Sequence, residues 1–205
     1  MAIALKNPIM ARVDDRASFL RHLLEEYPMF LNSWEIKQRD GFAKMADDIA
    51  GEDNDVKNSV YSSFLTAFDD DESRKDMFYQ SVFLMCYSYY ESCIAKLSQV
   101  ANASEHIKAI CNTKNIVLSA KSQEAIAYIQ GDMNEVRNDI CHNNFGTYKR
   151  ASILRKVSEQ KLGLDFSDNV LSFTNPQIIF DILDKMHGVL HELCEKLGYK
   201  TRIIK

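Results

Sequence analysis

The sequence predicts an all-α protein, an up-and-down helical bundle around one long central helix, with one small β-hairpin before the last helix. The 205-residue chain holds only seven glycines and three prolines, which leaves little material for the many turns of a sheet protein. Apolar residues recur at intervals of three and four over most of the chain, the period of one helix face. Strand-like alternation is confined to one segment, residues 164–173.

The first third of the chain is expected to form three helices. Residues 13–31 carry leucines at helical spacing, and this helix is expected to end around Pro28. A second helix is expected over residues 34–50 and a third over residues 55–68, with a break at residues 51–55 between them.

The longest helix is expected at residues 73–101. Its apolar residues keep the three-four rhythm throughout, at Phe78, Val82, Met85, Cys86, Tyr89, Cys93, Leu97 and Val100. So apolar a helix is expected to be the central one, contacted on most sides. Its aromatic side chains are therefore interpreted as core rather than as a stacking platform for bases.

The rest of the chain is expected to be helical apart from the hairpin. The expected helices cover residues 104–111, 120–129, 133–142 and 147–161. A last helix is expected to be capped by Thr174 or Asn175, to carry Pro176 in its first turn and to stop at Gly198. Residues 1–52 are expected to be a helical extension packed in one compact unit with a domain over residues 53–205.

Composition favours an ordinary cytoplasmic protein. No apolar run approaches the roughly 20 residues of a membrane span, and residues 1–10 hold no signal-peptide core. The five cysteines form no C-x-x-C pair, which favours reduced thiols. Glycine-rich phosphate loops and Ser or Cys nucleophile signatures are missing, so no cofactor is expected. A net charge of −4 does not suggest a general nucleic-acid binder.

One short motif carries chemistry: Arg137, followed by Asn138 and, after three further residues, by His142. A guanidinium holds a phosphate by paired hydrogen bonds, and an imidazole moves a proton near neutral pH. The spacing alone is worth little, since roughly 0.7 such matches are expected by chance. Arg16 and His22 fit a looser version of it and are interpreted as the wet face of an amphipathic helix.

The sequence around this motif resembles the HEPN superfamily, all-helical domains whose nuclease members carry an Arg, four to six residues and a His. A second point of resemblance is Glu91, a glutamate within the apolar run of the long upstream helix. The resemblance covers residues 55–198. It implies a metal-independent endoribonuclease in a bacterial toxin or phage-defence setting, a homodimer, and an antitoxin or regulatory protein as a further partner.

The resemblance also implies roles for the site residues. His142 is expected to be the general acid or base of 2′-hydroxyl attack and Arg137 to stabilise the phosphoryl charge. Asn138 is expected to orient His142 or to bind RNA, and Glu91 to orient the motif through a charge pair. Some HEPN toxins carry a tyrosine two residues after the His, where this chain has Asn144. The alternative is a structural network of Arg137 and His142 in a non-catalytic module that binds RNA or a protein.

Helical geometry sets a condition on the motif. Arg137 and His142 are five residues apart, about 140° around a straight helix, so they do not share a face. Either the helix ends or distorts near Cys141, for which residues 143–146 are suitable, or two copies of the motif converge across a dimer axis.

Two further sets of charged residues are candidates for binding. The first is a basic stretch after the motif that suits an RNA backbone, with a solvated helix face as the alternative; it contains Lys149, Arg150, Arg155 and Lys156. The second is His187 and His191, which are spaced for a metal on one helix face near two glutamates. That pair shows no obvious third ligand, so no metal is expected.

Overall fold

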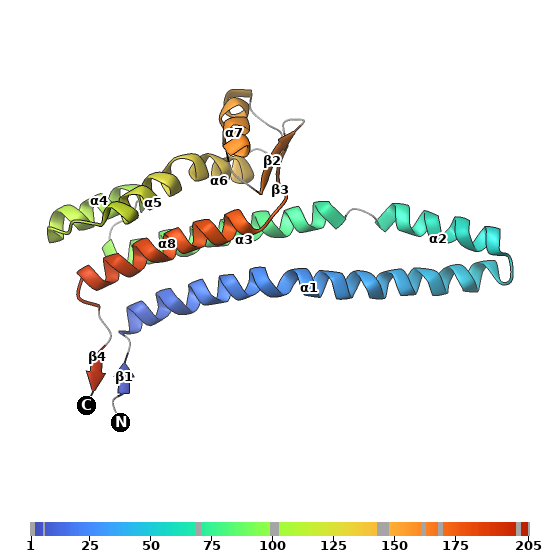
Figure 1. Cartoon of the computed structure of the whole chain (residues 1–205), viewed down its shortest axis with the longest axis horizontal. Helices are drawn as coiled ribbons and strands as arrows, with labels where there is room; N and C mark the ends of the chain where they lie inside the picture. Colours follow the sequence, from blue (N-terminus) through green and yellow to red (C-terminus); the bar gives the residue numbers. More distant parts are fainter. Residues whose placement is uncertain are drawn as a thin grey trace.

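The structure of the chain is a computed structural model that describes residues 3–5, 7–68, 71–98, 103–142, 148–160, 163–167, 170–199 and 202–204. It is predominantly helical, which confirms the all-α prediction. The helices are α1 Pro8–Ala50, α2 Asn54–Phe68, α3 Asp71–Ser98, α4 Ala103–Lys114, α5 Ala120–Gln130, α6 Asp132–His142, α7 Tyr148–Gln160 and α8 Gln177–Lys196 (Figure 1). The strands are β1 Ile3–Leu5, β2 Leu164–Ser167, β3 Val170–Phe173 and β4 Arg202–Ile204.

Helix α1 runs unbroken for 43 residues, so the prediction of a helix end around Pro28 is wrong. A proline in a helix interior removes one backbone hydrogen bond and costs about 3 kcal/mol. Leu24 and Leu31 are buried on either side of Pro28, and Tyr27 stacks on Phe78 of α3 with 3.4 Å between ring centroids. These contacts hold the chain helical through the proline.

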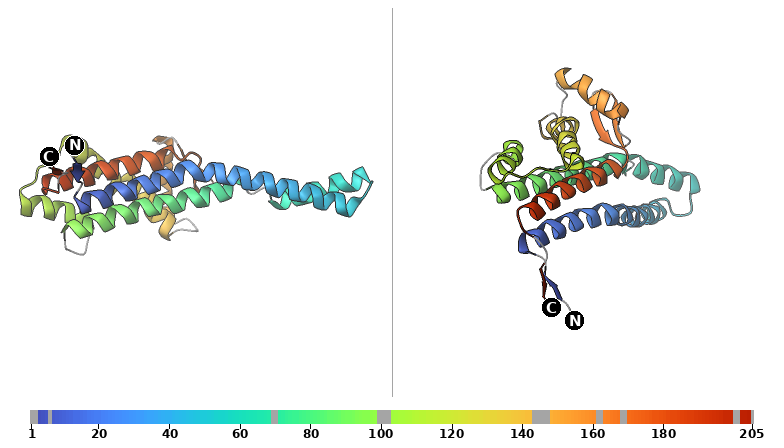
Figure 2. Two further views of the ribbon diagram at one scale, coloured as in Figure 1. Left: turned by 90° about the horizontal axis from the view of Figure 1, so that it is seen from below. Right: turned by 60° about the vertical axis from the view of Figure 1, so that its left-hand side comes forward.

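The first half of α1, α3 and α8 lie side by side and enclose the core (Figure 2). Helix α3 is buried beyond the single apolar face that its three-four spacing predicts. Phe83 and Ile94 do not belong to that spacing, yet both are fully buried. Met85, which lies within that rhythm, is 41% exposed. The expected central position of α3 is therefore observed, with a wider buried face than the predicted one.

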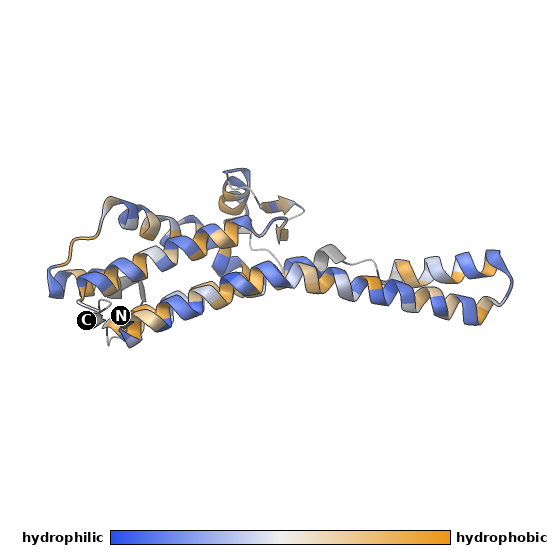
Figure 3. Cartoon of the chain, turned by 60° about the horizontal axis from the view of Figure 1, so that its bottom comes forward, coloured by the Kyte–Doolittle hydropathy of each residue, from blue (hydrophilic) through white to orange (hydrophobic). Residues whose placement is uncertain are grey.

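The second half of α1 and α2 form a two-helix arm that projects beyond the bundle (Figures 1 and 2). Phe42 stacks on Phe64 of α2 at 5.4 Å, and Ala46 is fully buried between the helices. Ile36 and Ile49 remain 53% and 62% exposed, and apolar patches run along the arm (Figure 3). Two helices alone cannot cover all their apolar residues.

The expected division at residue 52 does not separate two cores. Met10, Val13 and Leu20 of α1 belong to the same buried cluster as α3 and α8. The N-terminal segment is thus both part of the core and, further along, the root of the arm.

The predicted hairpin is confirmed as β2 and β3, with Leu164 opposite Phe173 and Phe166 opposite Leu171. Gly163 precedes β2 with φ of 96°, and its carbonyl accepts a hydrogen bond from the Thr174 amide at 3.0 Å. The expected cap of the last helix is also present, since the Asn175 carboxamide accepts from the Gln177 amide at 2.8 Å. Residues 168 and 169, which connect the two strands, lie outside the described residues.

A second pair of strands joins the two ends of the described chain. β1 pairs antiparallel with β4, with Ile3 opposite Ile204 and Leu5 opposite Arg202, beyond the end of the bundle (Figure 1). The sequence did not predict this pair, because three-residue strands are too short to show alternation. None of the helices in the described part of the chain is long and apolar enough to cross a membrane.

Candidate active site

The motif lies on α6, which follows α5 after the single residue Gly131. An added Cβ on Gly131 would lie 2.7 Å from the Ala127 carbonyl oxygen, so only glycine fits this junction. Asp132 and Glu135 occupy the first turn of α6, where carboxylates are favourable against the helix dipole. The junction and these charges fix where α6 begins and therefore where Arg137 lies.

Helix α6 is described as far as His142, so the first of the two geometric conditions, an end or distortion of the helix near Cys141, stays a prediction. The side chain of His142 and residues 143–147, which include Asn144, lie outside the described residues. Over the regular turns of α6, the five-residue spacing still places Arg137 and His142 about 140° apart. Any convergence of the two side chains therefore depends on the end of the helix or on a second copy.

The Arg137 guanidinium lies between α6 and α3. Its Nη1 donates a hydrogen bond to Asn138 Oδ1 at 3.2 Å, and its Nη2 lies 3.8 Å from Glu91 Oε1. The Arg137 side chain is 30% exposed and that of Glu91 is 45% exposed. A guanidinium carries several N–H donors, and the bond to Asn138 is the one that Arg137 donates among the described residues. The other donors are available to a ligand.

Two tyrosines of α3 line the same region. Burial raises the pKa of Tyr87, and Tyr90, Tyr128 and Glu91 raise it further, while the positive charge of Arg137 opposes them. The Tyr87 hydroxyl donates to the Ile129 carbonyl at 2.8 Å, which ties α3 to the end of α5. The Tyr90 hydroxyl is buried without a hydrogen-bond partner in the described structure.

Tyr87 and Asp139 are site neighbours that sequence reasoning missed. Asp139 is one of two buried polar residues found in the described core and lies on α6, two positions after Arg137. A signal for Tyr87 was present, since Tyr87 and Glu91 are four residues apart and share a helix face. No sequence signal distinguishes Asp139 from an exposed acid.

The basic stretch after the motif forms α7, which packs through Leu154 and Val157. Arg155 and Lys156 are exposed on its outer face, where they can meet a phosphate backbone. Lys149 belongs to α7, as does Arg150, but the side chains of these two residues lie outside the description.

The alternative metal site on α8 is not assembled. His187 Nε2 lies 2.9 Å from Asp14 Oδ1 of α1, while His191 faces Glu195 at 3.9 Å. The two imidazole centroids are 6.1 Å apart and at an angle of 72°. Among the described residues, no group of three His, Cys, Asp or Glu side chains is arranged to hold a metal ion.

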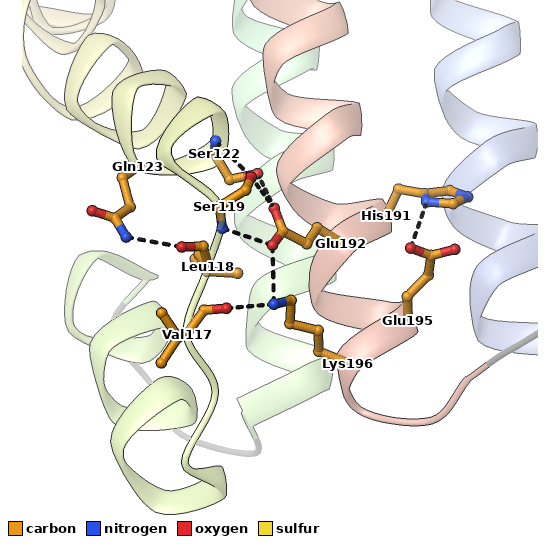
Figure 4. A network of polar contacts seen from close by, with 9 residues as sticks. All are labelled: Val117, Leu118, Ser119, Ser122, Gln123, His191, Glu192, Glu195 and Lys196. Carbon is orange, nitrogen blue, oxygen red and sulfur yellow. Dashed lines mark hydrogen bonds and ion pairs between the residues drawn. The ribbon is translucent and has the colours of Figure 1, made fainter.

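The nearby Glu192 has a structural use instead (Figure 4). Its carboxylate accepts hydrogen bonds from the Ser119 amide at 2.8 Å, the Ser119 hydroxyl at 2.7 Å and the Ser122 hydroxyl at 2.5 Å. Burial raises the pKa of Glu192, but the hydrogen bonds from Ser122 and Ser119 outweigh it and lower the pKa to about 2. Glu192 therefore anchors the start of α5 on α8.

A groove of about 760 Å³ lies between α5 and α8, away from Arg137. Two of its charged side chains have partners within the fold: Asp184 pairs with Arg21, and the Lys185 ammonium lies 5.2 Å from the Tyr128 ring centroid. The hydroxyls of Ser119 and Ser122 in the groove donate to the Glu192 carboxylate, a contact that anchors α5 on α8, so the end of α6 remains the candidate for chemistry.

Comparisons with protein-family models, with curated proteins and with solved structures give no match to this chain.

Proposed function

We propose that the protein is a metal-independent endoribonuclease of the HEPN type, with its site at the end of α6. The observation that carries the proposal is the partly exposed Arg137 guanidinium, contacted by Asn138 and Glu91, five residues before the last described residue of the same helix. A phosphate binds to such a guanidinium through the donors that Asn138 leaves available.

In the proposed reaction, the 2′-oxygen of a ribose attacks the adjacent phosphorus. The P–O2′ bond forms and the P–O5′ bond breaks. The 2′-hydroxyl loses its proton, and the departing 5′-oxygen gains one. His142 moves one of these protons as general acid or base, and Arg137 stabilises the charge on the non-bridging oxygens. The products are a 2′,3′-cyclic phosphate and a 5′-hydroxyl.

Glu91 acts as a positioning residue. At 3.8 Å from Nη2, its carboxylate attracts the guanidinium without forming a hydrogen bond, so it orients Arg137 while leaving it mobile enough to take a phosphate. A homodimer in which two α6 ends face one cleft satisfies the geometric condition directly. A toxin or phage-defence role, with an antitoxin or regulatory protein as partner, belongs to the same proposal. Arg155 and Lys156 supply the charge that holds the RNA backbone.

The test is cleavage of total RNA in excess EDTA by the wild-type protein and by the Arg137→Ala variant. We expect wild-type cleavage to survive EDTA and the variant to lose about 10²–10³-fold in rate, the usual effect of losing one stabilising group. His22→Ala is the control, because His22 is 71% exposed and forms the looser Arg–His match with Arg16. We expect the His22→Ala variant to cleave RNA at the wild-type rate. RNA binding without cleavage by the wild type would favour the non-catalytic module.

A further inference from the structure

The far end of the arm carries a concentrated negative charge. This arm tip, residues 47–57, holds five acidic residues and one lysine, a net charge of −4 in eleven residues. Lys57 pairs with Asp47, and Asp53 caps α2 by accepting from the Asp55 and Val56 amides at 3.0 and 3.1 Å. Asp48, Glu52 and Asp55 are exposed and form no ion pair within the described structure.

Apolar side chains stand among these acids. Ile49 is 62% exposed and Val56 is 42% exposed, on the two helices that meet at the arm tip. No other part of the described chain covers them, since the arm tip is the most distant point from the bundle (Figures 1 and 2). The combination of apolar residues with one sign of charge is typical of a surface for a basic amphipathic partner.

Helix α7 has the complementary character. Its residues carry four basic side chains and one acid, a net charge of +3. Arg155 and Lys156 are exposed, and Ile153 between the basic positions is 40% exposed. The chain thus presents an acidic surface with two exposed aliphatics and a basic surface with one.

The two surfaces cannot meet within one molecule, because α7 stands off the side of the bundle near the middle of the long axis, while the arm tip lies at one end of that axis (Figures 1 and 2). Helix α1 is roughly 65 Å long at 1.5 Å per residue, and it is continuous, which keeps the arm tip away from the bundle. The contact requires a second copy.

We propose that the arm tip of one copy docks on α7 of a second copy. Two copies related by a two-fold axis between the arm tip and α7 make this contact twice, with the arms antiparallel, and so form a closed dimer. The proposal does not depend on nuclease activity. If α7 also binds RNA, the arm tip and RNA compete for the same basic side chains.

The test uses analytical ultracentrifugation of the full chain with two charge-reversal variants. One variant reverses the arm tip (Asp48→Lys, Glu52→Lys, Asp55→Lys) and the other reverses α7 (Arg155→Glu, Lys156→Glu). We expect each variant to raise the dissociation constant of self-association at least tenfold, and the variant with both reversals, whose two surfaces again carry opposite charges, to recover part of the lost association. Raising NaCl from about 50 mM to about 500 mM is expected to weaken the wild-type association, because salt screens exposed charges.

A matched control reverses three exposed acids away from the arm tip, Asp15, Glu25 and Glu124, which also form no ion pair within the described structure. We expect it to associate as the wild type does. Circular dichroism shows whether each variant is folded. A wild type that stays monomeric at low salt overturns the proposal, as does an α7 reversal without effect or a combined variant that associates no better than the single reversals. If the dimer forms through the α6 ends alone, none of these charge reversals changes its dissociation constant.

Discussion

At the residue scale, the proposed chemistry depends on how few of the Arg137 N–H donors form hydrogen bonds within the described structure. A buried structural arginine donates its hydrogen bonds to carbonyls and carboxylates. Arg137 donates one hydrogen bond to Asn138 and lies 3.8 Å from Glu91 without a hydrogen bond to it. Its side chain retains 30% exposure, enough for a phosphate to reach it. Arg16 of the looser match also donates one hydrogen bond, to Ser92, so it differs from Arg137 in the residue that follows it, Ala17 in place of Asn138, and not in its use of donors.

Glu192 is the residue whose structural role is most easily measured. We expect Glu192→Gln to lower the free energy of unfolding by about 1–3 kcal/mol near neutral pH, because the neutral amide weakens three hydrogen bonds at the start of α5. In the folded protein the pKa of Glu192 is about 2, below the ordinary value of 4.5, so its contribution to stability is complete above pH 4.5 and is lost as the pH falls toward 2.

Urea unfolding between neutral pH and pH 3 checks this prediction. The variant is expected to lose less stability than the wild type below pH 4.5. Glu195→Gln is the control, since Glu195 is half-exposed and faces His191 at 3.9 Å, and its effect is expected to stay within about 0.5 kcal/mol. Equal acid sensitivity in wild type and Glu192→Gln would contradict the anchoring role.

At the scale of elements, the junction between α5 and α6 is the tightest point near the site. We expect Gly131→Ala to destabilise the protein by about 1–3 kcal/mol, because the new Cβ would meet the Ala127 carbonyl oxygen at 2.7 Å. Thermal unfolding measures the effect. Gly188→Ala in α8 is the control: a Cβ there meets open space, so alanine is expected to stabilise the helix by about 0.5–1 kcal/mol. Similar shifts in the two variants would refute the close approach.

The sequence predicted the elements well where local signals and packing agree. The Asn175 cap of α8 and the alternation in β2 and β3 each act within a few residues. The helix end predicted at Pro28 was wrong because the preference of proline against a helix interior is local, while Leu24 and Leu31 are buried by helices distant in sequence. Ile36 and Ile49 have core-like spacing and yet stay exposed, because the arm offers them one neighbouring helix.

The candidate site was predictable in its residues but not in its neighbours. The order Arg137, Asn138, His142 can be found in the sequence, and Glu91 was expected to form a charge pair with the motif. The contact of α3 with α5 through Tyr87 depends on how three helices cross, which periodicity does not determine. Whether the site is catalytic stays a prediction.

At the scale of the whole molecule, one core carries two projecting features, the long arm and the α7–hairpin unit (Figure 1). The site lies where α6 leads toward α7, beside a basic helix and far from the acidic arm tip. The net charge of +3 on α7 gives a protein with a net charge of −4 a locally positive helix after the motif, while α6 itself carries Asp132, Glu135 and Asp139 against Arg137.

The most direct test of the central claim is the chemistry of the RNA ends left by the wild-type protein in EDTA, compared with His142→Ala. The account predicts 2′,3′-cyclic phosphate and 5′-hydroxyl ends, and a rate at least about 10²-fold lower for the variant. Ends with a 3′-hydroxyl and 5′-phosphate, or undiminished cleavage by His142→Ala, would contradict it.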